Sequence, residues 1–223
     1  MMLMSELNCV YEDEHLLVLN KPSGLLCVPG RGPDKQDCLS LRALQHFGDA
    51  LVVHRLDQAT SGLVIMARNL PVQRQLSQAF AERQVQKRYV AVVAGELQQD
   101  PVAADDENWQ LIDLPIAADW ERRPLRIINN ETGKSSQTLW KVLQPVNHCG
   151  LPATRVLLSP LTGRTHQLRL HMAATGHAIL GDALYACGEA LAASPRLLLH
   201  AAALEMTHPV TGTLLKIESV PDF

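Results

Sequence analysis

The apolar residues of this chain recur in short runs of strand length, bounded by glycine, proline or acidic turn residues. The run Leu63–Ala67 is continuously apolar, and Tyr89–Ala94 is rich in β-forming residues and ends at Gly95. We expect further strands at Cys9–Tyr11, Leu16–Leu19, Gln137–Leu143, Thr154–Leu158, Leu197–Met206 and Leu214–Ile217. A chain with this many short strands must build its core around a sheet.

Helical spacing is confined to a few stretches. Leu39–Phe47 has it and stops at Gly48. A clearer helix follows Asn69, which can cap it, with Pro71 in the first turn and an apolar stripe from Val72 to Phe80 that ends near Arg83. Thr165–Ala174 is expected to open after Gly163 and to stop at Gly176.

Strands and helices interleave without the regular βαβ period of a parallel sheet. We therefore predict a mixed α/β (α+β) fold, with a largely antiparallel mixed sheet flanked by a few helices. The chain has 223 residues and is 47% hydrophobic, which is enough for a sizeable core. We expect one domain over residues 1–223, with two lobes around a central cleft. Aromatic residues make up only 4%, so the core must be mostly aliphatic and each aromatic residue needs its own explanation.

Several protein classes are disfavoured. No apolar run approaches the roughly 20 residues that span a bilayer, and the first residues do not resemble a secretory signal. The five cysteines are odd in number, widely spaced and free of any C-x-x-C pair. A disulfide framework or a zinc knuckle is therefore not expected, and a cytoplasmic protein fits best.

Charge is unevenly distributed, although the formal net charge is only −3. Residues 96–121 contain eight acids and no Lys or Arg, whereas residues 122–169 contain eight basic residues and one acid. Residues 55–88 add six basic residues and two acids. If the two basic stretches share a face, they suit a polyanion site better than the net charge does. Charge alone leaves scattered solvated side chains as the alternative.

The polar, acidic stretch from Gln98 to Gln110 is the best candidate for a mobile loop.

Residues 54–62 concentrate chemically useful side chains between two apolar runs. An imidazole, a guanidinium, a carboxylate and two hydroxyls come from His54, Arg55, Asp57, Thr60 and Ser61. Loops held between rigid strands are where site residues concentrate, and a carboxylate there can act as a nucleophile or a general base. The alternative is structural, with Asp57 capping a turn and Thr60 and Ser61 bonding locally to the backbone.

Residues 162–171 form a second polar cluster. If this segment opens a helix, the N-terminal amides and Arg164 make an anion-attracting pocket, with Arg169 in the helix itself. Arg169 could ion-pair with a carboxylate from elsewhere and keep it ionised. The alternative is that Arg164 and Arg169 are solvated surface charges.

A metal or nucleotide cofactor is not expected. His166 and His171 are five residues apart, which rotates them by about 140° on a helix, so they cannot share a face as metal ligands do. A set made of His54, Asp57 and Asp182 has only residue type in its favour. No glycine-rich phosphate loop is present.

The motifs together resemble the RluA family of RNA pseudouridine synthases, in order and over nearly the whole chain. The central motif is His54-Arg55-Leu56-Asp57-x-x-Thr60-Ser61-Gly62-Leu63. The flanking motifs are Asn20-Lys21-Pro22-Ser23-Gly24, Lys87-Arg88-Tyr89-Val90-Ala91, residues 162–169, Gly181-Asp182-x-x-Tyr185, Leu199-His200-Ala201 and His208-Pro209. The family often has glycine directly after the tyrosine of the Gly181-Asp182-x-x-Tyr185 motif, where this chain has Ala186. The likeness is to short members without an S4-type RNA-binding domain.

The resemblance implies an isomerase with the pseudouridine synthase fold and no cofactor. It implies that Asp57 is the catalytic carboxylate, that Tyr89 packs on the target base and is a candidate base for the C5 proton, and that Arg169 pairs with Asp57. An unperturbed phenol has a pKa of about 10, so that role of Tyr89 requires a lowered pKa or close coupling; the alternative is a core strand residue. The sequence leaves open whether Asp57 attacks the ring or C1′ covalently, or removes a proton from C2′.

The resemblance also implies base flipping. Arg55 is expected to enter the vacated stack, because a planar guanidinium stacks on bases, and His54 to support the rearranged RNA. We also assign Arg164 and His166 to the RNA-binding set. The expected partners are large-subunit rRNA, tRNA anticodon stem-loops, or both, for a monomer that needs no metal or membrane. A non-catalytic RNA-binding module and a metal-dependent hydrolase are the competing functions.

Overall fold

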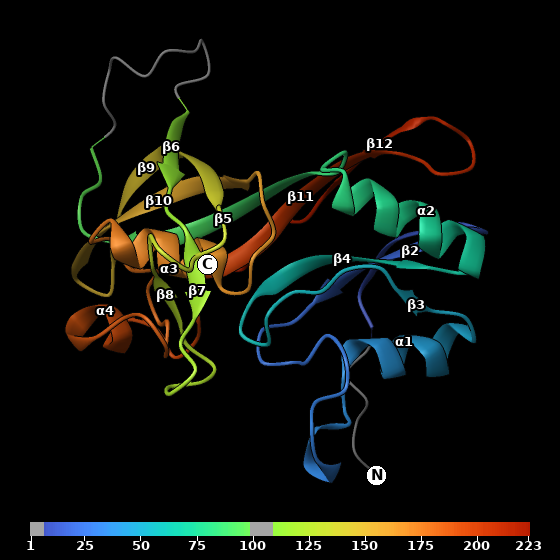
Figure 1. The fold of residues 1–223 in the computed structure, drawn as a ribbon, viewed down its shortest axis with the longest axis horizontal. Coiled ribbons are helices and arrows are strands. Elements are labelled where there is room, and N and C mark those ends of the chain that lie inside the picture. Colours follow the sequence, from blue (N-terminus) through green and yellow to red (C-terminus); the bar gives the residue numbers. More distant parts are fainter. Residues whose placement is uncertain (1–6, 99–108) are drawn as a thin grey trace. The chain divides into compact units, whose positions relative to one another are not determined.

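A computed structural model describes residues 7–98 and 109–223 (Figure 1). It divides into two compact units, one made of the described residues up to Lys87 together with His200–Asp222, the other of Arg88–Leu199 with Phe223. The chain leaves the first unit within β5 (Gln86–Ala94) and returns at the start of β11 (Leu199–Thr207). The single domain with two lobes around a cleft stays a prediction. None of the helices in the described ranges is long and apolar enough to cross a membrane.

The first unit is organised around β4 (Ser61–Ala67), whose seven residues are all buried. One edge of β4 pairs antiparallel with β2 (Leu16–Lys21), which in turn pairs with β1 (Cys9–Glu12). The other edge is shared. β3 (Leu51–Val52) pairs with its last two residues, and β11 pairs parallel with Ser61 and Gly62. A final strand, β12 (Leu214–Glu218), pairs antiparallel with β11.

Local signals determine where the two helices of this unit begin and end. α1 (Leu39–Phe47) ends at Gly48, which has the left-handed φ of 78° expected of a glycine after a helix. α2 (Leu70–Ala81) is capped by Asn69, whose side chain accepts a hydrogen bond from the Val72 backbone at 3.0 Å. A short 3-10 helix, η1 (Pro33–Lys35), lies between β2 and α1.

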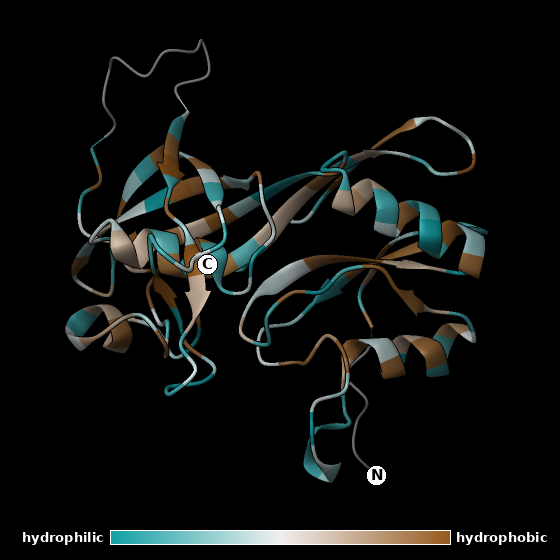
Figure 2. Ribbon diagram, in the orientation of Figure 1, coloured by the Kyte–Doolittle hydropathy of each residue, from teal (hydrophilic) through white to brown (hydrophobic). Residues whose placement is uncertain are grey.

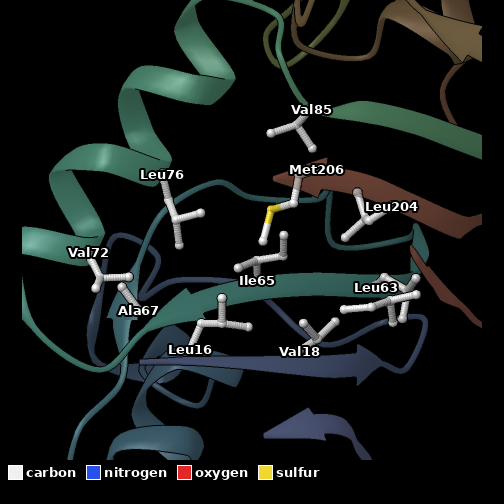
Figure 3. Packing of buried hydrophobic residues seen from close by; sticks show 11 residues of the cluster. Leu16, Val18, Leu63, Ile65, Ala67, Val72, Leu76, Val85, Leu204 and Met206 are labelled. Carbon is white, nitrogen blue, oxygen red and sulfur yellow. The ribbon is translucent and has the colours of Figure 1, made fainter. Parts of the chain in front are cut away.

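The core of the first unit lies between α2 and the sheet. Figure 3 shows Val72 and Leu76 of α2 directed toward Ile65 and Ala67 of β4, with Met206 of β11 beside them. α2 alternates hydrophilic and hydrophobic residues along its length (Figure 2), so it buries one stripe and leaves the other to solvent. Burial of each such aliphatic side chain contributes about 1.5–3 kcal/mol.

The second unit is built on a long hairpin. β9 (Gln137–His148) and β10 (Leu151–Pro160) are joined by Cys149 and Gly150, which both have positive φ, as a tight hairpin turn requires. β10 also pairs with β5, and β9 pairs with β6 (Gln110–Asp113). A separate hairpin consists of β7 (Ile116–Ala118) and β8 (Arg126–Ile128). The helices are α3 (Gln167–Ala174) and α4 (Gly188–Ala192).

The predicted class, a mixed fold with a largely antiparallel sheet, is confirmed: every strand pair named above is antiparallel except β4 with β11. β9 continues five residues beyond the predicted Leu143, because pairing with β10 carries it through Pro145. The short strands β3, β6, β7 and β8 were not predicted. Most of the predicted mobile loop, residues 99–108, lies outside the described residues.

Gly62→Ala should destabilise the protein by about 3 kcal/mol, because overpacking and positive φ act together there. An added Cβ would lie 2.4 Å from the Ala201 carbonyl oxygen, at a φ of +110°. Gly48→Ala is the matched control, since its φ is +78° and nothing lies within 4 Å of the added atom. That variant should lose only about 1 kcal/mol. Urea unfolding measures both losses, and equal losses would contradict the close approach of β4 and β11.

Candidate active site

The loop between β3 and β4, which carries Asp57, is clamped by the turn that follows β2. The Gln58 carbonyl accepts the Gly24 backbone N–H at 2.9 Å, and the Gln58 amide nitrogen donates to the Gly24 carbonyl at 3.0 Å. The Ser23 hydroxyl donates to the Ala59 carbonyl at 2.7 Å. Two motifs that are far apart in the sequence therefore form one hydrogen-bonded structure.

A buried ammonium completes this clamp. Lys21 has no exposed surface, and its Nζ donates to the carbonyls of Pro22, Leu25 and Gln58 at 2.8–3.0 Å. All three of its protons thus have an acceptor. Burial lowers the pKa of Lys21 to about 8, while the charges of Cys27 and Asp57 act in the opposite direction. The Asp57 carboxylate is therefore close enough to stabilise the Lys21 charge.

His54 is held by protein contacts at the start of the same loop. Its Nε2 accepts the Ile65 backbone N–H at 3.0 Å, and its ring stacks on Phe80 with 4.4 Å between centroids. Burial, followed by the charge of Lys87, lowers the pKa of His54 to about 3, so the ring is neutral at pH 7. The imidazole thus bonds to β4 between the short pairings with β3 and β11.

The rest of the loop presents a cation and a carboxylate. Arg55 is exposed, Leu56 is buried beside it, and Asp57 is half-buried, with its carbonyl accepting the Thr60 N–H at 3.1 Å. This backbone bond closes a turn at Asp57. It involves the backbone carbonyl of Asp57, so the role of the carboxylate stays a prediction. At the end of the loop the Ser61 hydroxyl is bonded to buried His200 of β11 at 2.9 Å.

In the second unit, Arg169 is buried in the first turn of α3 against Asp182. Its Nε and Nη2 contact the two carboxylate oxygens of Asp182 at 2.7 and 2.5 Å. This side-on pair holds the plane of the guanidinium. The interpretation of Arg169 as a solvated surface charge is therefore wrong. Its predicted pairing with Asp57, which belongs to the other unit, stays a prediction.

Tyr185 links Arg169 to a further predicted residue. Its ring centroid lies 5.4 Å from the Arg169 guanidinium carbon. Its hydroxyl is hydrogen-bonded to His166 Nδ1 and accepts the Arg126 backbone N–H, both at 2.9 Å. We call Arg169, Asp182, Tyr185 and His166 the arginine hub. Asp182 also accepts the backbone N–H of Leu184 at 2.9 Å, so one carboxylate orients both Arg169 and the turn that leads to Tyr185.

The sequence predicted that this helix begins at Thr165, but α3 begins at Gln167. The physical reason is the Gln167 side chain, whose oxygen accepts from the Thr162 hydroxyl and the Arg164 N–H, while its nitrogen donates to Thr138 of β9. These bonds hold residues 162–166 in a turn, with His166 at a φ of 58°. Arg164 is exposed on that turn, and its predicted anion pocket stays untested.

Tyr89 lies in β5 opposite Leu158 of β10 and is half-buried. A strand position of this kind fits either the predicted packing on a base or a structural role, so the assignment of Tyr89 stays a prediction.

No group of three His, Cys, Asp or Glu side chains is arranged to hold a metal within residues 7–98 and 109–223. The alternative set of His54, Asp57 and Asp182 is further weakened. His54 Nε2 already accepts a backbone N–H, and Asp182 is bonded to Arg169. All five cysteines are free thiols.

Comparison with known proteins identifies the family. Residues 15–174 match the family model described as RNA pseudouridylate synthase. The chain belongs to this family. A dual-specificity RNA pseudouridine synthase RluA from Yersinia pestis is 46% identical over 214 residues, which cover 96% of this chain and 98% of that protein. RluA from Escherichia coli K12 is 45% identical over 96% of this chain and 93% of that protein.

The solved structure of human RNA pseudouridylate synthase domain containing 1 has a TM-score of 0.80 and 30% identity, and covers 98% of this chain and 84% of that one. The predicted resemblance, the pseudouridine synthase fold and the enzyme class, an isomerase acting on RNA, are thereby confirmed.

For this pseudouridylate synthase, the structure places the predicted site residues in two groups. His54, Arg55 and Asp57 share the clamped loop of the first unit, while Arg169 and His166 belong to the arginine hub of the second. No individual role was predicted for Lys21 or Tyr185, and Asp182 was named only as a member of an unsupported metal-ligand set. All three stand in the family motifs, which was the available signal. Neither spacing nor composition indicates that Lys21 and Asp182 are buried charges.

Lys21→Met should lower the rate of pseudouridine formation by about a hundredfold, because the Asp57 loop loses its clamp and small misplacements cost that much. The wild-type rate should also fall as the pH rises through about 8, where Lys21 loses its proton. The unfolded chain keeps that proton up to the ordinary pKa of 10.5. Between these two pKa values the unfolded chain binds more protons at Lys21 than the folded protein does. The contribution of Lys21 to the free energy of unfolding therefore rises with pH, so unfolding at Lys21 does not explain the loss of rate.

The measurement is a pH–rate profile with urea unfolding at each pH. Lys216→Met is the matched control, because its side chain is 63% exposed and far from this loop in the sequence. The step near pH 8 should persist in Lys216→Met and disappear in Lys21→Met. A wild-type rate that stays level from pH 7 to 9.5 would show that the charge of Lys21 is not needed.

Asp182→Asn should destabilise the protein by about 3 kcal/mol, because it leaves a buried guanidinium without its counter-charge. Chemical unfolding tests this, with Asp37→Asn as the control, since Asp37 pairs with Arg42 at an exposed position. That surface pair should contribute less than about 1 kcal/mol. Comparable losses in the two variants would argue against the arginine hub as the anchor of α3.

Proposed function

We propose that this enzyme converts specific uridines to pseudouridine in large-subunit rRNA, tRNA anticodon stem-loops, or both, with Asp57 as the catalytic carboxylate. The reaction breaks the N1–C1′ bond, turns the freed base and rejoins it through C5, with no net redox change or hydrolysis. The observation that carries the proposal is the clamp on the Asp57 loop. The buried Lys21 ammonium donates one hydrogen bond to this loop, at the Gln58 carbonyl, and Ser23 and Gly24 of the neighbouring turn make three more hydrogen bonds with Gln58 and Ala59.

Asp57 supplies the reacting carboxylate, by attack on the ring or C1′ or by removal of the C2′ proton. Arg169 keeps it ionised and oriented through the part of its guanidinium that the side-on pair with Asp182 does not use. Support for this comes from the arginine hub, because a guanidinium already held in plane loses little entropy when it binds a second carboxylate.

The remaining residues act on the RNA. Chemistry at C1′ and C5 requires an unstacked base, at a cost of a few kcal/mol. Exposed Arg55 fills the vacated stack, and Tyr89 packs on the flipped base and takes the C5 proton. Neutral His54, held in place by its contacts with Ile65 and Phe80, supports the rearranged RNA. Arg164 and His166 contact the RNA from the turn before α3.

The dual-specificity names of the relatives support a substrate range that includes more than one RNA class. We further propose a cytoplasmic monomer that needs neither metal nor cofactor, since each step above uses side chains of the chain itself.

Asp57→Asn should abolish pseudouridine formation while leaving RNA affinity within about twofold of wild type, because a neutral amide of nearly the same shape replaces the ionised carboxylate that carries out the chemistry. The assay maps pseudouridine in rRNA and tRNA from cells that lack the gene, after addition of each purified variant in excess chelator. Product formed by Asp57→Asn would exclude Asp57 as the essential carboxylate. Failure of the wild type under chelation would refute the cofactor-free proposal.

A further inference from the structure

The loop of the β7–β8 hairpin, residues 119–125, carries Trp120, the one exposed Phe, Tyr or Trp side chain within residues 7–98 and 109–223. Trp120 is 72% exposed, whereas Trp109 and Trp140 are buried. The Arg123 guanidinium carbon lies 4.0 Å from the Trp120 ring centroid. In a chain with 4% aromatic residues, a large ring left in solvent and paired with a cation needs an explanation.

This loop has a defined internal structure. The buried carboxylate of Asp119 accepts the Arg122 backbone N–H at 3.1 Å and its Nε at 2.8 Å. The Asp119 N–H donates to the Leu125 carbonyl, and the Leu125 N–H to the Arg122 carbonyl. The loop extends away from the β9–β10 hairpin (Figure 1). Trp120 is therefore presented on an ordered turn.

The three arginines of the hairpin differ in whether a carboxylate pairs with them. Arg122 is neutralised by Asp119. Arg123 and Arg126, by contrast, have no ion pair with any residue in the described ranges, and Arg126 Nε has no hydrogen-bond partner there. The Arg126 backbone is bonded to Tyr185, so the hairpin is attached to the arginine hub of the same unit. The hairpin thus carries an exposed indole ring and two guanidinium groups without an ion pair among the described residues, of which Arg126 has a buried Nε.

We propose that the β7–β8 loop is an RNA contact, in which Trp120 stacks on an unpaired base of the substrate and Arg123 and Arg126 contact its phosphates. The inference rests on the proposed function, which supplies RNA with unpaired bases. Single-stranded and looped RNA is bound by base stacking on aromatic rings and arginine planes, and by phosphate contacts of basic side chains. A protein partner fits less well, because no apolar cluster surrounds Trp120 in residues 119–125, where Glu121 to Pro124 are exposed and mostly charged.

The test uses the full chain with a synthetic tRNA anticodon stem-loop and, for comparison, a blunt duplex of the same stem. Trp120→Leu should raise the dissociation constant for the stem-loop about tenfold and leave the duplex within twofold, whereas Trp120→Phe keeps a ring and should stay near wild type. Arg123→Ala should make the slope of log affinity against log salt shallower by about 0.7. Lys216→Ala, a single-charge change at an exposed site outside the hairpin, should leave that slope unchanged.

Fluorescence gives a direct readout, because two of the three tryptophans are buried. The stem-loop should quench wild-type emission and not that of Trp120→Phe. Wild-type affinity in Trp120→Leu, or equal quenching in Trp120→Phe, would overturn the proposal. Pseudouridine is scored in the same samples. A wild-type enzyme that binds but forms no product refutes this RNA as a substrate, whereas the loop contact is judged by affinity and quenching alone.

Discussion

The first unit depends on a charge that has been removed from water. A buried ammonium is costly unless each of its protons finds an acceptor, and Lys21 satisfies this condition with three carbonyls. Two of them belong to its own turn and the third to the Asp57 loop. The turn and the loop must therefore keep their positions relative to each other for the charge to be tolerated. This requirement makes the position of Asp57 a consequence of folding, and the nearby carboxylate adds a favourable interaction with the same charge.

The second unit solves a similar problem with a different pair. Arg169 is buried, and Asp182 satisfies two of its N–H groups while ordering the backbone that follows it. The neutral part of the network is also complete. Gln167 donates to Thr138, the Thr138 hydroxyl to His171 Nδ1, and His171 Nε2 to the Leu114 carbonyl, so one tautomer of the histidine accounts for all the bonds. Partly satisfied networks are destabilising, and this one leaves α3 a single position on β9.

What the sequence predicted well was local. The ends of α1 and α2 follow from Gly48, Asn69 and Pro71, which act within a few residues, and the buried strand β4 follows from its apolar run. What it predicted poorly depends on distant partners. The start of α3 was wrong because Gln167 bonds to β9, about 29 residues away. Asp57 and Arg169 came from an ordered set of motifs, since neither stands out locally, and the buried ion pair of Arg169 with Asp182 could not be deduced from residue spacing.

The effective charge of a stretch also depends on ion-pair partners outside it that the sequence does not reveal. The net positive charge of residues 122–169 made this stretch a candidate polyanion surface. However, Arg122 and Arg169 are neutralised by Asp119 and Asp182, which lie outside the stretch. Their charges contribute little to long-range attraction of RNA. Arg123 and Arg126 remain unpaired among the described residues, and Trp120 is exposed beside Arg123. The capacity to hold an RNA therefore depends less on net charge than on which cations the fold leaves without a carboxylate, and this is decided by single residues such as Asp119.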